Sequence, residues 1–304
     1  MRTAFIEQLI EEAKIHDDIF LLVGDLGFSV VEPFARQFPN RYMNVGIAEQ
    51  NMAGIAAGLS MTGYNVYIYS IGNFPTLRCM EQIRYDIAYP KLNVKIVAVG
   101  GGYAYASLGP SHHATEEIGM LRTIPNMVIC APGDPVEAKS ITTWSAEYIG
   151  PAYIRLGKAG EPLVHHSHDL TIKVGAPLSV YNQQARQAVI TSGSMLYAAI
   201  EFVKNNNIMS DVYSLPFLKP LDKDAFAEFY GRYERIICLE EHQASGGAGS
   251  ALLEMLNDLQ DEKRLTTVPI IKRIAIPDTF ISVSGSQNYL RELAGLELKK
   301  EYFI

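Results

Sequence analysis

The residue with the clearest chemical potential is Glu49, a carboxylate within the stretch at residues 44–51. This stretch forms a turn that runs into an apolar helix, and small or apolar residues at 52–59 face every side of that helix. We expect the helix to be buried, with glycines that let other backbones approach closely. A poorly solvated acid favours its neutral form and can share a proton with a ligand nitrogen. The alternative is an ordinary helix-start carboxylate that serves only the helix dipole.

Two other polar clusters invite a functional interpretation. His165, His166 and His168 could ligate a metal, but histidines in a polar connector are more often solvated, so we predict no metal site. The turn at residues 246–249 follows Glu240 and Glu241 and superficially suggests a phosphate cradle. It lacks the Lys-Ser/Thr pair of a P-loop, so we expect a tight turn from a strand into a helix.

Composition limits the class of protein. The chain has 304 residues, of which 48% are hydrophobic, and this is ample for two domains. Its net charge of −7 argues against nucleic acid or an anionic membrane as the main partner. Cys79, Cys130 and Cys238 show no paired spacing that would indicate disulfides or zinc. Without a signal-like start or a membrane-length apolar run, a cytoplasmic location is expected.

The chain alternates helical patterns with strand patterns. Strands are expected at 19–23, 65–70, 93–99, 127–131, 152–156, 188–191, 211–215 and 236–239. Between them, Pro75 and Pro135 suit helix starts, and Asp134 can cap the second of these helices. This alternation predicts an α/β fold with mostly parallel sheets. We predict two three-layer α/β/α domains at 1–160 and 176–304, joined by a linker at 161–175.

Several ordered motifs carry a family resemblance. Residues 41–52, 73–78, 81–84, 111–117 and 124–127 resemble the pyrimidine-binding domain of transketolases, in the same order and at similar spacing. Residues 216–222 and 240–249 resemble the transketolase C-terminal domain. The resemblance therefore covers nearly the whole chain and favours a catalytic interpretation of Glu49.

The resemblance implies thiamine diphosphate as the cofactor. In this family the cofactor lies between a domain that grips its diphosphate through a metal ion and a domain that holds its aminopyrimidine ring. This chain resembles the second. Glu49 matches the glutamate that hydrogen-bonds the pyrimidine ring nitrogen, Phe74 matches the aromatic residue that stacks on the ring, and Ile71 falls where a second ring-pocket residue is expected. The protein activates the cofactor, and the cofactor performs the carbanion chemistry.

Three further residues are expected on the substrate side. His112 matches a histidine that reaches the substrate side of the cofactor, where it could orient a donor hydroxyl or move protons. Lys158 falls where the family often has an arginine that binds substrate phosphate, and Arg78 is a second candidate for binding an anion. A lysine lacks the bidentate fork of arginine, so its phosphate recognition should be looser. His113 could instead be a loop or capping residue.

Two departures from the family pattern concern the substrate. The loop at 100–110 lacks the histidine usual near its start, and Leu108 stands where many transketolases have an aspartate that reads a sugar hydroxyl. Loss of a carboxylate leaves hydroxyls unpaired and can change substrate preference by orders of magnitude. We therefore expect a dedicated ketol transfer that involves an unusual sugar.

A third departure concerns the metal. The family's diphosphate domain carries a Gly-Asp-Gly motif followed by an Asn that binds magnesium, whereas here Gly24 and Asp25 are followed by Leu26. The resemblance thus implies a split transketolase subunit, a transferase active only with a separate N-terminal-type subunit that supplies the magnesium ligands. A heterotetramer with two copies of each chain is expected. The alternatives are a beta-type subunit of a pyruvate- or oxo-acid-using enzyme and a noncatalytic scaffolding subunit.

Overall fold

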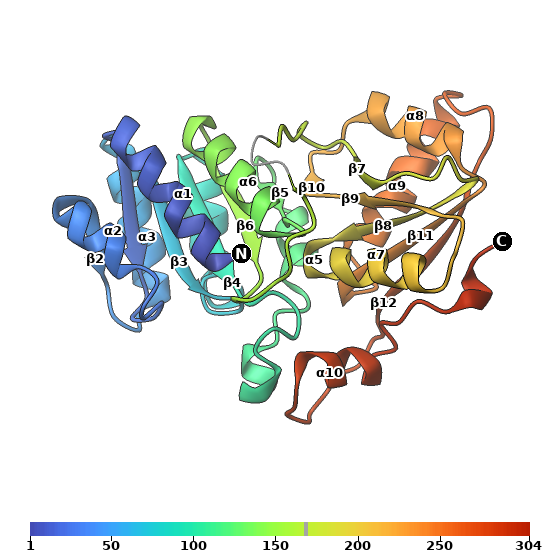
Figure 1. Ribbon diagram of the computed structural model, residues 1–304. Helices are drawn as coiled ribbons and strands as arrows, with labels where there is room; N and C mark the ends of the chain where they lie inside the picture. The colour runs from blue at the N-terminus through green and yellow to red at the C-terminus, as the bar shows by residue number, and fades with distance from the viewer. Residues whose placement is uncertain (167–169) are drawn as a thin grey trace.

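The computed structural model describes residues 1–166 and 170–304 and consists of two domains side by side (Figure 1). Each domain has a mostly parallel sheet with helices on both faces. The predicted fold of two three-layer α/β/α domains is therefore confirmed.

The first domain is built on a seven-stranded sheet in the order β10-β5-β6-β4-β3-β1-β2. Its strands are β1 (Ile19–Val23), β2 (Tyr42–Asn44), β3 (Asn65–Ile71), β4 (Val94–Val99), β5 (Val128–Cys130), β6 (Ala152–Leu156) and β10 (Phe217–Lys219). Its helices are α1 (Arg2–Ile15), α2 (Glu32–Gln37), α3 (Glu49–Met61), α4 (Met80–Gln82), α5 (Glu117–Arg122) and α6 (Pro135–Glu147). Every strand pairing in this sheet is parallel except that of β10 with β5.

The strand sequences set the two faces of this sheet. Successive strand side chains point to opposite faces, so an apolar run of five or six residues must be covered on both. Leu22 and Ile68 pack with α3 and α5, whereas Leu21 and Tyr67 pack with α1, α2 and α6. Because β1, β3, β4 and β6 run parallel, the loops that follow them all emerge at the carboxyl edge of the sheet.

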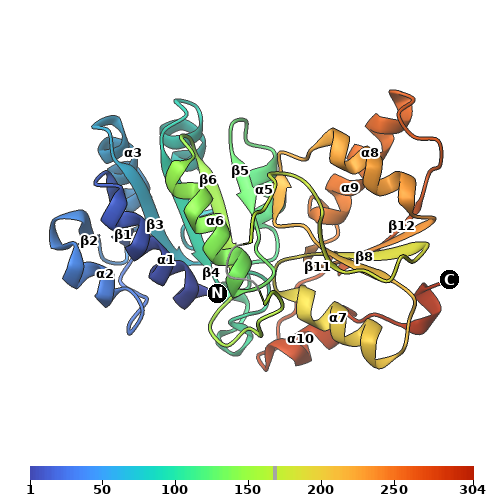
Figure 2. The ribbon, with the colours of Figure 1, turned by 45° about the horizontal axis from the view of Figure 1, so that its top comes forward.

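The second domain has a five-stranded sheet in the order β12-β11-β8-β9-β7, in which β7 is antiparallel. Figure 2 shows its strands β8, β11 and β12. The strands are β7 (Leu178–Tyr181), β8 (Gln187–Ser192), β9 (Asp211–Ser214), β11 (Arg235–Gln243) and β12 (Ile270–Ile276). The helices are α7 (Leu196–Asn205), α8 (Lys223–Arg232), α9 (Ala248–Asp261) and α10 (Gln287–Leu293). Helices α8 and α9 share one continuous core with α3 and α5 of the first domain, so the domains are packed together.

Several expectations need correction. Strands β2, β7, β10 and β12 were not predicted, and β10 joins the first domain's sheet although it comes after the linker. The helix expected to start at Pro75 begins instead at Leu77 and passes through 3-10, α and π turns. Helix α3 is not buried on every side, because Gly54 and Gly58 are exposed.

Candidate active site

Glu49 lies at the first position of α3, at the carboxyl edge of the first sheet. Its carboxylate is 2% exposed and accepts a hydrogen bond of 2.9 Å from the Arg78 guanidinium. A Cβ atom added to Gly24 would lie 3.5 Å from Ser70 Oγ and 3.7 Å from Glu49 Cγ, so these two side chains converge above Gly24. Within the described residues Ser70 Oγ is buried without a hydrogen-bond partner. The site therefore offers an acid and an unused hydroxyl near the same glycine.

The Phe74 ring is linked to this acid through Arg78. Phe74 follows β3 and is half-buried, and the Arg78 guanidinium carbon lies 4.8 Å from its ring centroid. The His112 ring meets Phe74 edge-on, with centroids 5.2 Å apart. Ile71, the last residue of β3, is also half-buried. A partly open aromatic face between a cation and an imidazole suits the stacking of a flat heterocycle.

His112 belongs to a loop whose backbone is held by Asn73. The Asn73 amide donates hydrogen bonds to the carbonyl oxygens of Ser111 and His113. His112 Nδ1 lies 3.0 Å from Ser111 Oγ. Partial burial lowers the pKa of His112, which favours its neutral form at pH 7. A neutral imidazole can accept a proton from a substrate hydroxyl.

Lys158 lies apart from this group. It follows β6 at the same edge of the sheet and is exposed, and its backbone carbonyl accepts from the Arg2 amide. Within the described residues, no hydrogen bond or ion pair engages its side chain. The structure thus links Glu49, Arg78, Phe74 and His112 through successive contacts and leaves Lys158 outside that chain.

Sequence reasoning missed Ser70 and Asn73. Ser70 is a small polar residue one position before the end of β3, and this placement near a carboxyl edge is a usable signal. Asn73 stood within a recognised motif but received no role. Both residues lie near segments that are distant in the sequence: Ser70 near Gly24, and Asn73 near Ser111 and His113. The sequence alone does not show these contacts.

A cavity of about 460 Å³ adjoins the His112 loop. Its lining includes Asn73, Tyr103 and His113 from the first domain and Phe280 from the second. His113 is buried, which lowers its pKa, and its Nε2 has no partner within the described residues. The hollow places the second domain next to the candidate site.

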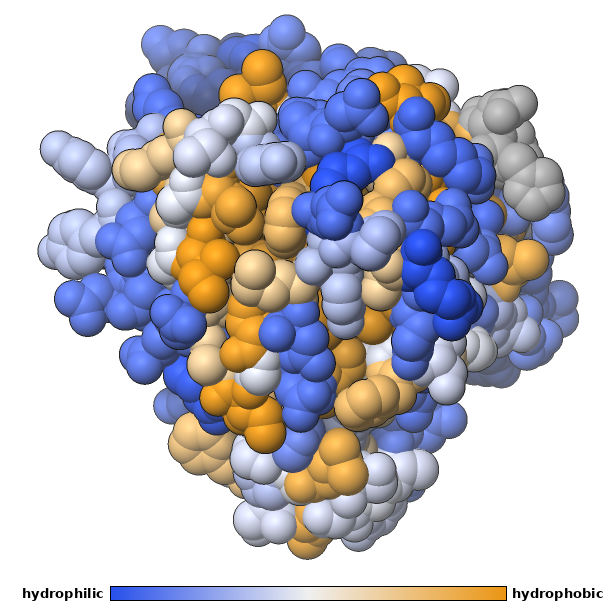
Figure 3. Space-filling view, turned by 90° about the vertical axis from the view of Figure 1, so that its left-hand side faces the viewer, coloured by the Kyte–Doolittle hydropathy of each residue, from blue (hydrophilic) through white to orange (hydrophobic). Residues whose placement is uncertain are grey.

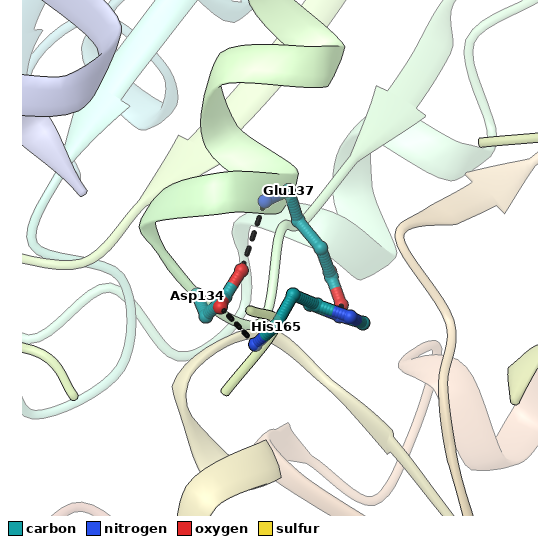
Figure 4. A group of neighbouring side chains, drawn as sticks. All are labelled: Asp134, Glu137 and His165. Atoms are coloured by element: carbon teal, nitrogen blue, oxygen red, sulfur yellow. Dashed lines mark hydrogen bonds and ion pairs between the residues drawn. The ribbon is translucent and has the colours of Figure 1, made fainter. Parts of the chain in front are cut away.

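Two acids and a histidine, Asp134, Glu137 and His165, form a cluster that ties α6 to the segment around residue 165 (Figure 4). Asp134 caps α6 by accepting from the Glu137 amide, and its other oxygen accepts from the amides of Val164 and His165. Glu137 Oε1 lies 2.9 Å from His165 Nε2, and Glu137 Oε2 accepts a hydrogen bond from Ser214 Oγ of β9. These bonds use the atoms that a metal would need. His168 lies outside the described residues.

A strand-to-helix turn was expected at residues 246–249; it lies at residues 244–247, between β11 and α9, because the helix already begins at Ala248. The buried Glu240 carboxylate accepts from the amides of Ala248 and Gly249 at the N-terminus of α9. Burial raises the pKa of Glu240 to about 7. An internal carboxylate occupies the position that a phosphate would take in a cradle.

Comparison with known families matches both domains. The family described as "Transketolase, pyrimidine binding domain" matches residues 1–160, and "Transketolase, C-terminal domain" matches residues 179–300. Separately, among the described residues no helix has the length and apolar character needed to cross a membrane.

Relatives and a solved structure agree with these matches. A transketolase C-terminal section from Methanocaldococcus jannaschii is 34% identical and covers 98% of this chain and 92% of that protein. One of the subunits of an apulose-4-phosphate transketolase from Phocaeicola vulgatus is 32% identical, with coverages of 97% and 93%. A solved split-gene transketolase, described as an inactive beta4 tetramer, has a TM-score of 0.82 and 33% identity, with coverages of 97% and 93%.

Proposed function

Because this chain belongs to the transketolase family, we propose that it is one subunit of a split, thiamine diphosphate-dependent transketolase. The reaction is transfer of a two-carbon ketol unit from a ketose or ketose phosphate donor to an aldehyde acceptor, in a dedicated sugar pathway. Relatives whose names give them as subunits of such enzymes support this assignment. The proposed division into 1–160, a linker at 161–175 and 176–304 is supported by the two family matches.

The observation that carries the proposal is that the buried Glu49 carboxylate and the half-buried ring of Phe74 both contact the Arg78 guanidinium. These residues and the unpartnered Ser70 Oγ fit an aminopyrimidine, which offers a flat ring together with ring and exocyclic nitrogens. When bound, thiamine diphosphate supplies a nucleophilic carbon that forms and stabilises the carbanion equivalent. Glu49, Phe74 and Ile71 would hold the pyrimidine portion.

Each residue then has a definite task. Glu49 holds a proton at the pyrimidine ring nitrogen, and its burial strengthens that hydrogen bond. Phe74 fixes the plane of the ring by stacking. His112, neutral at pH 7, orients a substrate hydroxyl or accepts its proton. Arg78 is 47% exposed, so it can leave Glu49 for a substrate anion when the ring binds.

Substrate recognition combines cations with an apolar loop. Arg78 and Lys158 are the proposed anion contacts, and the lysine acts as a point charge. Leu108, which stands where a sugar-reading carboxylate is usual, is exposed. This supports a substrate other than the common pentose and heptose phosphates.

The partner subunit is proposed to cover the outer face of α3. Between residues 45 and 63 the one charged residue is Glu49, and exposed apolar residues such as Met43, Ile47 and Met61 lie at this end of the molecule. Figure 3 shows apolar side chains gathered on this face. A Cβ atom added to Gly54 or Gly58 would meet none of the described atoms within 4 Å, so another backbone can approach closely.

That partner carries the diphosphate domain and the Mg²⁺ ligands. We propose a cytoplasmic heterotetramer with two copies of each chain. Calorimetry with thiamine diphosphate and Mg²⁺ tests the division of labour. The chain alone should bind the cofactor negligibly, and adding the partner should restore binding and turnover. Tight Mg²⁺-dependent binding by the chain alone would overturn the split-enzyme proposal.

Donor assays test the reaction type. Hydroxypyruvate or a ketose phosphate should support transfer by the reconstituted complex, whereas pyruvate should not. Turnover with pyruvate alone would favour the oxo-acid alternative.

A further inference from the structure

The loop that carries His112 has a narrow neck formed by Gly102 and Ala114. The Gly102 amide donates to the Ala114 carbonyl over 2.6 Å, and the Ala114 amide donates back over 3.0 Å. Gly102 has a φ of +66°, a conformation that favours glycine. The orientation of His112 therefore depends on what holds this neck.

Glu241 of the second domain holds one side of the neck. Its buried carboxylate accepts a hydrogen bond of 3.1 Å from the Tyr103 amide. A Cβ atom on Gly102 would lie 2.5 Å from Glu241 Cγ, so the backbone and this side chain are in close contact. The same carboxylate accepts from Ser194 Oγ, Gln287 Nε2 and the Arg291 guanidinium. Its position is thereby fixed by three side chains of its own domain.

Arg155 holds the other side of the neck. This buried side chain on β6 donates to the Ala114 carbonyl over 2.8 Å and to the Glu241 backbone carbonyl over 2.9 Å. It also pairs with Glu117, just beyond the loop, over 2.6 Å. Both sides of the neck therefore contact a buried polar network in which Arg155 of the first domain bonds Glu241 of the second.

Stability alone does not require this arrangement. Although burial favours the neutral acid, Arg291 and Arg155 hold the pKa of Glu241 below its ordinary value, so the carboxylate is charged. A buried charge network is often no more stabilising than apolar packing of the same volume. Its use at the neck of the His112 loop indicates a need for fixed geometry.

We propose that Glu241 is a positioning residue that sets the orientation of His112 through the Tyr103 amide and the neck of the loop. The positioning role would give the C-terminal domain a part in the reaction. This inference rests on the proposed function. Misplacement of a reacting group by about 1 Å can reduce a rate about a hundredfold. Within the described residues no hydrogen bond or ion pair joins Glu49 or Phe74 to Gly102, Ala114 or Glu241, so we expect cofactor binding to persist when the neck is disturbed.

Kinetics of the reconstituted complex test the proposal. Glu241→Gln should lower kcat at least about tenfold while the cofactor Kd changes less than about twofold. The matched control is Asp211→Asn, because Asp211 is equally buried in the same domain and accepts from the Gln183 amide and the Tyr233 hydroxyl. At a similar loss of Tm, this control should keep its kcat. Equal losses of kcat in both variants, or full kcat in Glu241→Gln, would overturn the proposal.

A second variant approaches the contact from the loop. Gly102→Ala retains Glu241, its partner Arg291 and Arg155, but pushes a methyl group against the Glu241 Cγ. It should reproduce the kcat loss with the cofactor Kd unchanged. Hydrogen exchange gives a readout that does not depend on the reaction. Amides of residues 103–116 should exchange faster in either variant than in the wild-type chain. Unchanged exchange there would contradict the positioning role, even if the catalytic proposal for Glu49 failed separately.

Discussion

The exposed Arg78 guanidinium lies 2.9 Å from the buried Glu49 carboxylate and is its ion-pair partner. The pair joins the start of α3 to the segment after β3, and it occupies the position where a ligand nitrogen is proposed to bind. A residue that is 47% exposed can move away at small cost, whereas the Glu49 carboxylate cannot. In the free chain the proposed catalytic acid is therefore expected to stay paired until the cofactor binds.

This relationship predicts a state-dependent effect of Arg78→Gln. In the free chain the change leaves a buried carboxylate without its partner and should cost about 1–3 kcal/mol of unfolding free energy. In the complex with bound cofactor the loss should be smaller, because a ring nitrogen takes the place of Arg78. Thermal denaturation of both forms measures the difference, with Arg84→Gln as a control on the same segment. Equal losses in the two forms would contradict exchange of partners.

Helix α3 yields a prediction in which stability and assembly move in opposite directions. Exposed helical glycine is less favourable than alanine by about 1 kcal/mol, so Gly54→Ala and Gly58→Ala should each stabilise the free chain. Both should weaken association with the partner, because a methyl group blocks close approach. Gly231→Ala in α8 is the matched control, since a Cβ there also meets none of the described atoms within 4 Å. It should stabilise the chain without affecting assembly. Unchanged affinity in the α3 variants would place the partner elsewhere.

His165 predicts a pH dependence of stability. Burial alone would lower the pKa of His165, but its hydrogen bond to Glu137 and the charges of Glu137 and Asp134 raise it above the ordinary value. A raised pKa in the folded state means that protonated His165 stabilises the fold. This contribution is complete below about pH 6.5 and is lost as pH rises through the folded-state pKa.

His165→Gln should therefore destabilise the chain more at about pH 5.5 than at about pH 8.5. Urea unfolding at the two pH values measures this difference. His166→Gln, at the exposed neighbouring position, should show little dependence on pH. A larger effect of His165→Gln at the high pH would reverse the sign and refute the assignment.

Much of the fold could be predicted from local patterns. The apolar run at residues 19–23 predicted β1 to the residue, because parallel strands are buried on both faces. Strand β6 was also predicted to the residue, although it contains Arg155. Strand β2 has three residues at a sheet edge, and β12 contains Lys272 and Arg273, so neither shows the apolar signal. Strand β10 pairs across the domain boundary, which no local pattern encodes.

The same limit applies to the candidate site. The helix start and its apolar continuation indicated a buried Glu49, and the structure buries it. Its partner Arg78 lies 29 positions away, and the Tyr103–Glu241 contact spans 138 positions. Such pairs arise from packing of whole elements. The exposed glycines of α3 were predicted to be buried because the sequence does not distinguish burial within a chain from burial against a partner.

Lys158 predicts a substrate-dependent effect. Replacing it with arginine supplies a bidentate fork, so Lys158→Arg should lower KM several-fold for a phosphorylated donor and leave hydroxypyruvate unaffected. Steady-state kinetics with both donors tests this, and Lys139→Arg on the exposed face of α6 serves as the control. The same change in KM for both donors would remove Lys158 from phosphate recognition.

The central claim is that Glu49 holds a proton at the cofactor's pyrimidine ring, and proton exchange tests it most directly. In the reconstituted complex, the rate of hydrogen–deuterium exchange at the reactive thiazolium carbon should fall at least about a hundredfold in Glu49→Gln, because the general acid–base partner is lost. Assembly with the partner should persist, as sedimentation would show. Wild-type exchange in an intact Glu49→Gln complex would contradict the account.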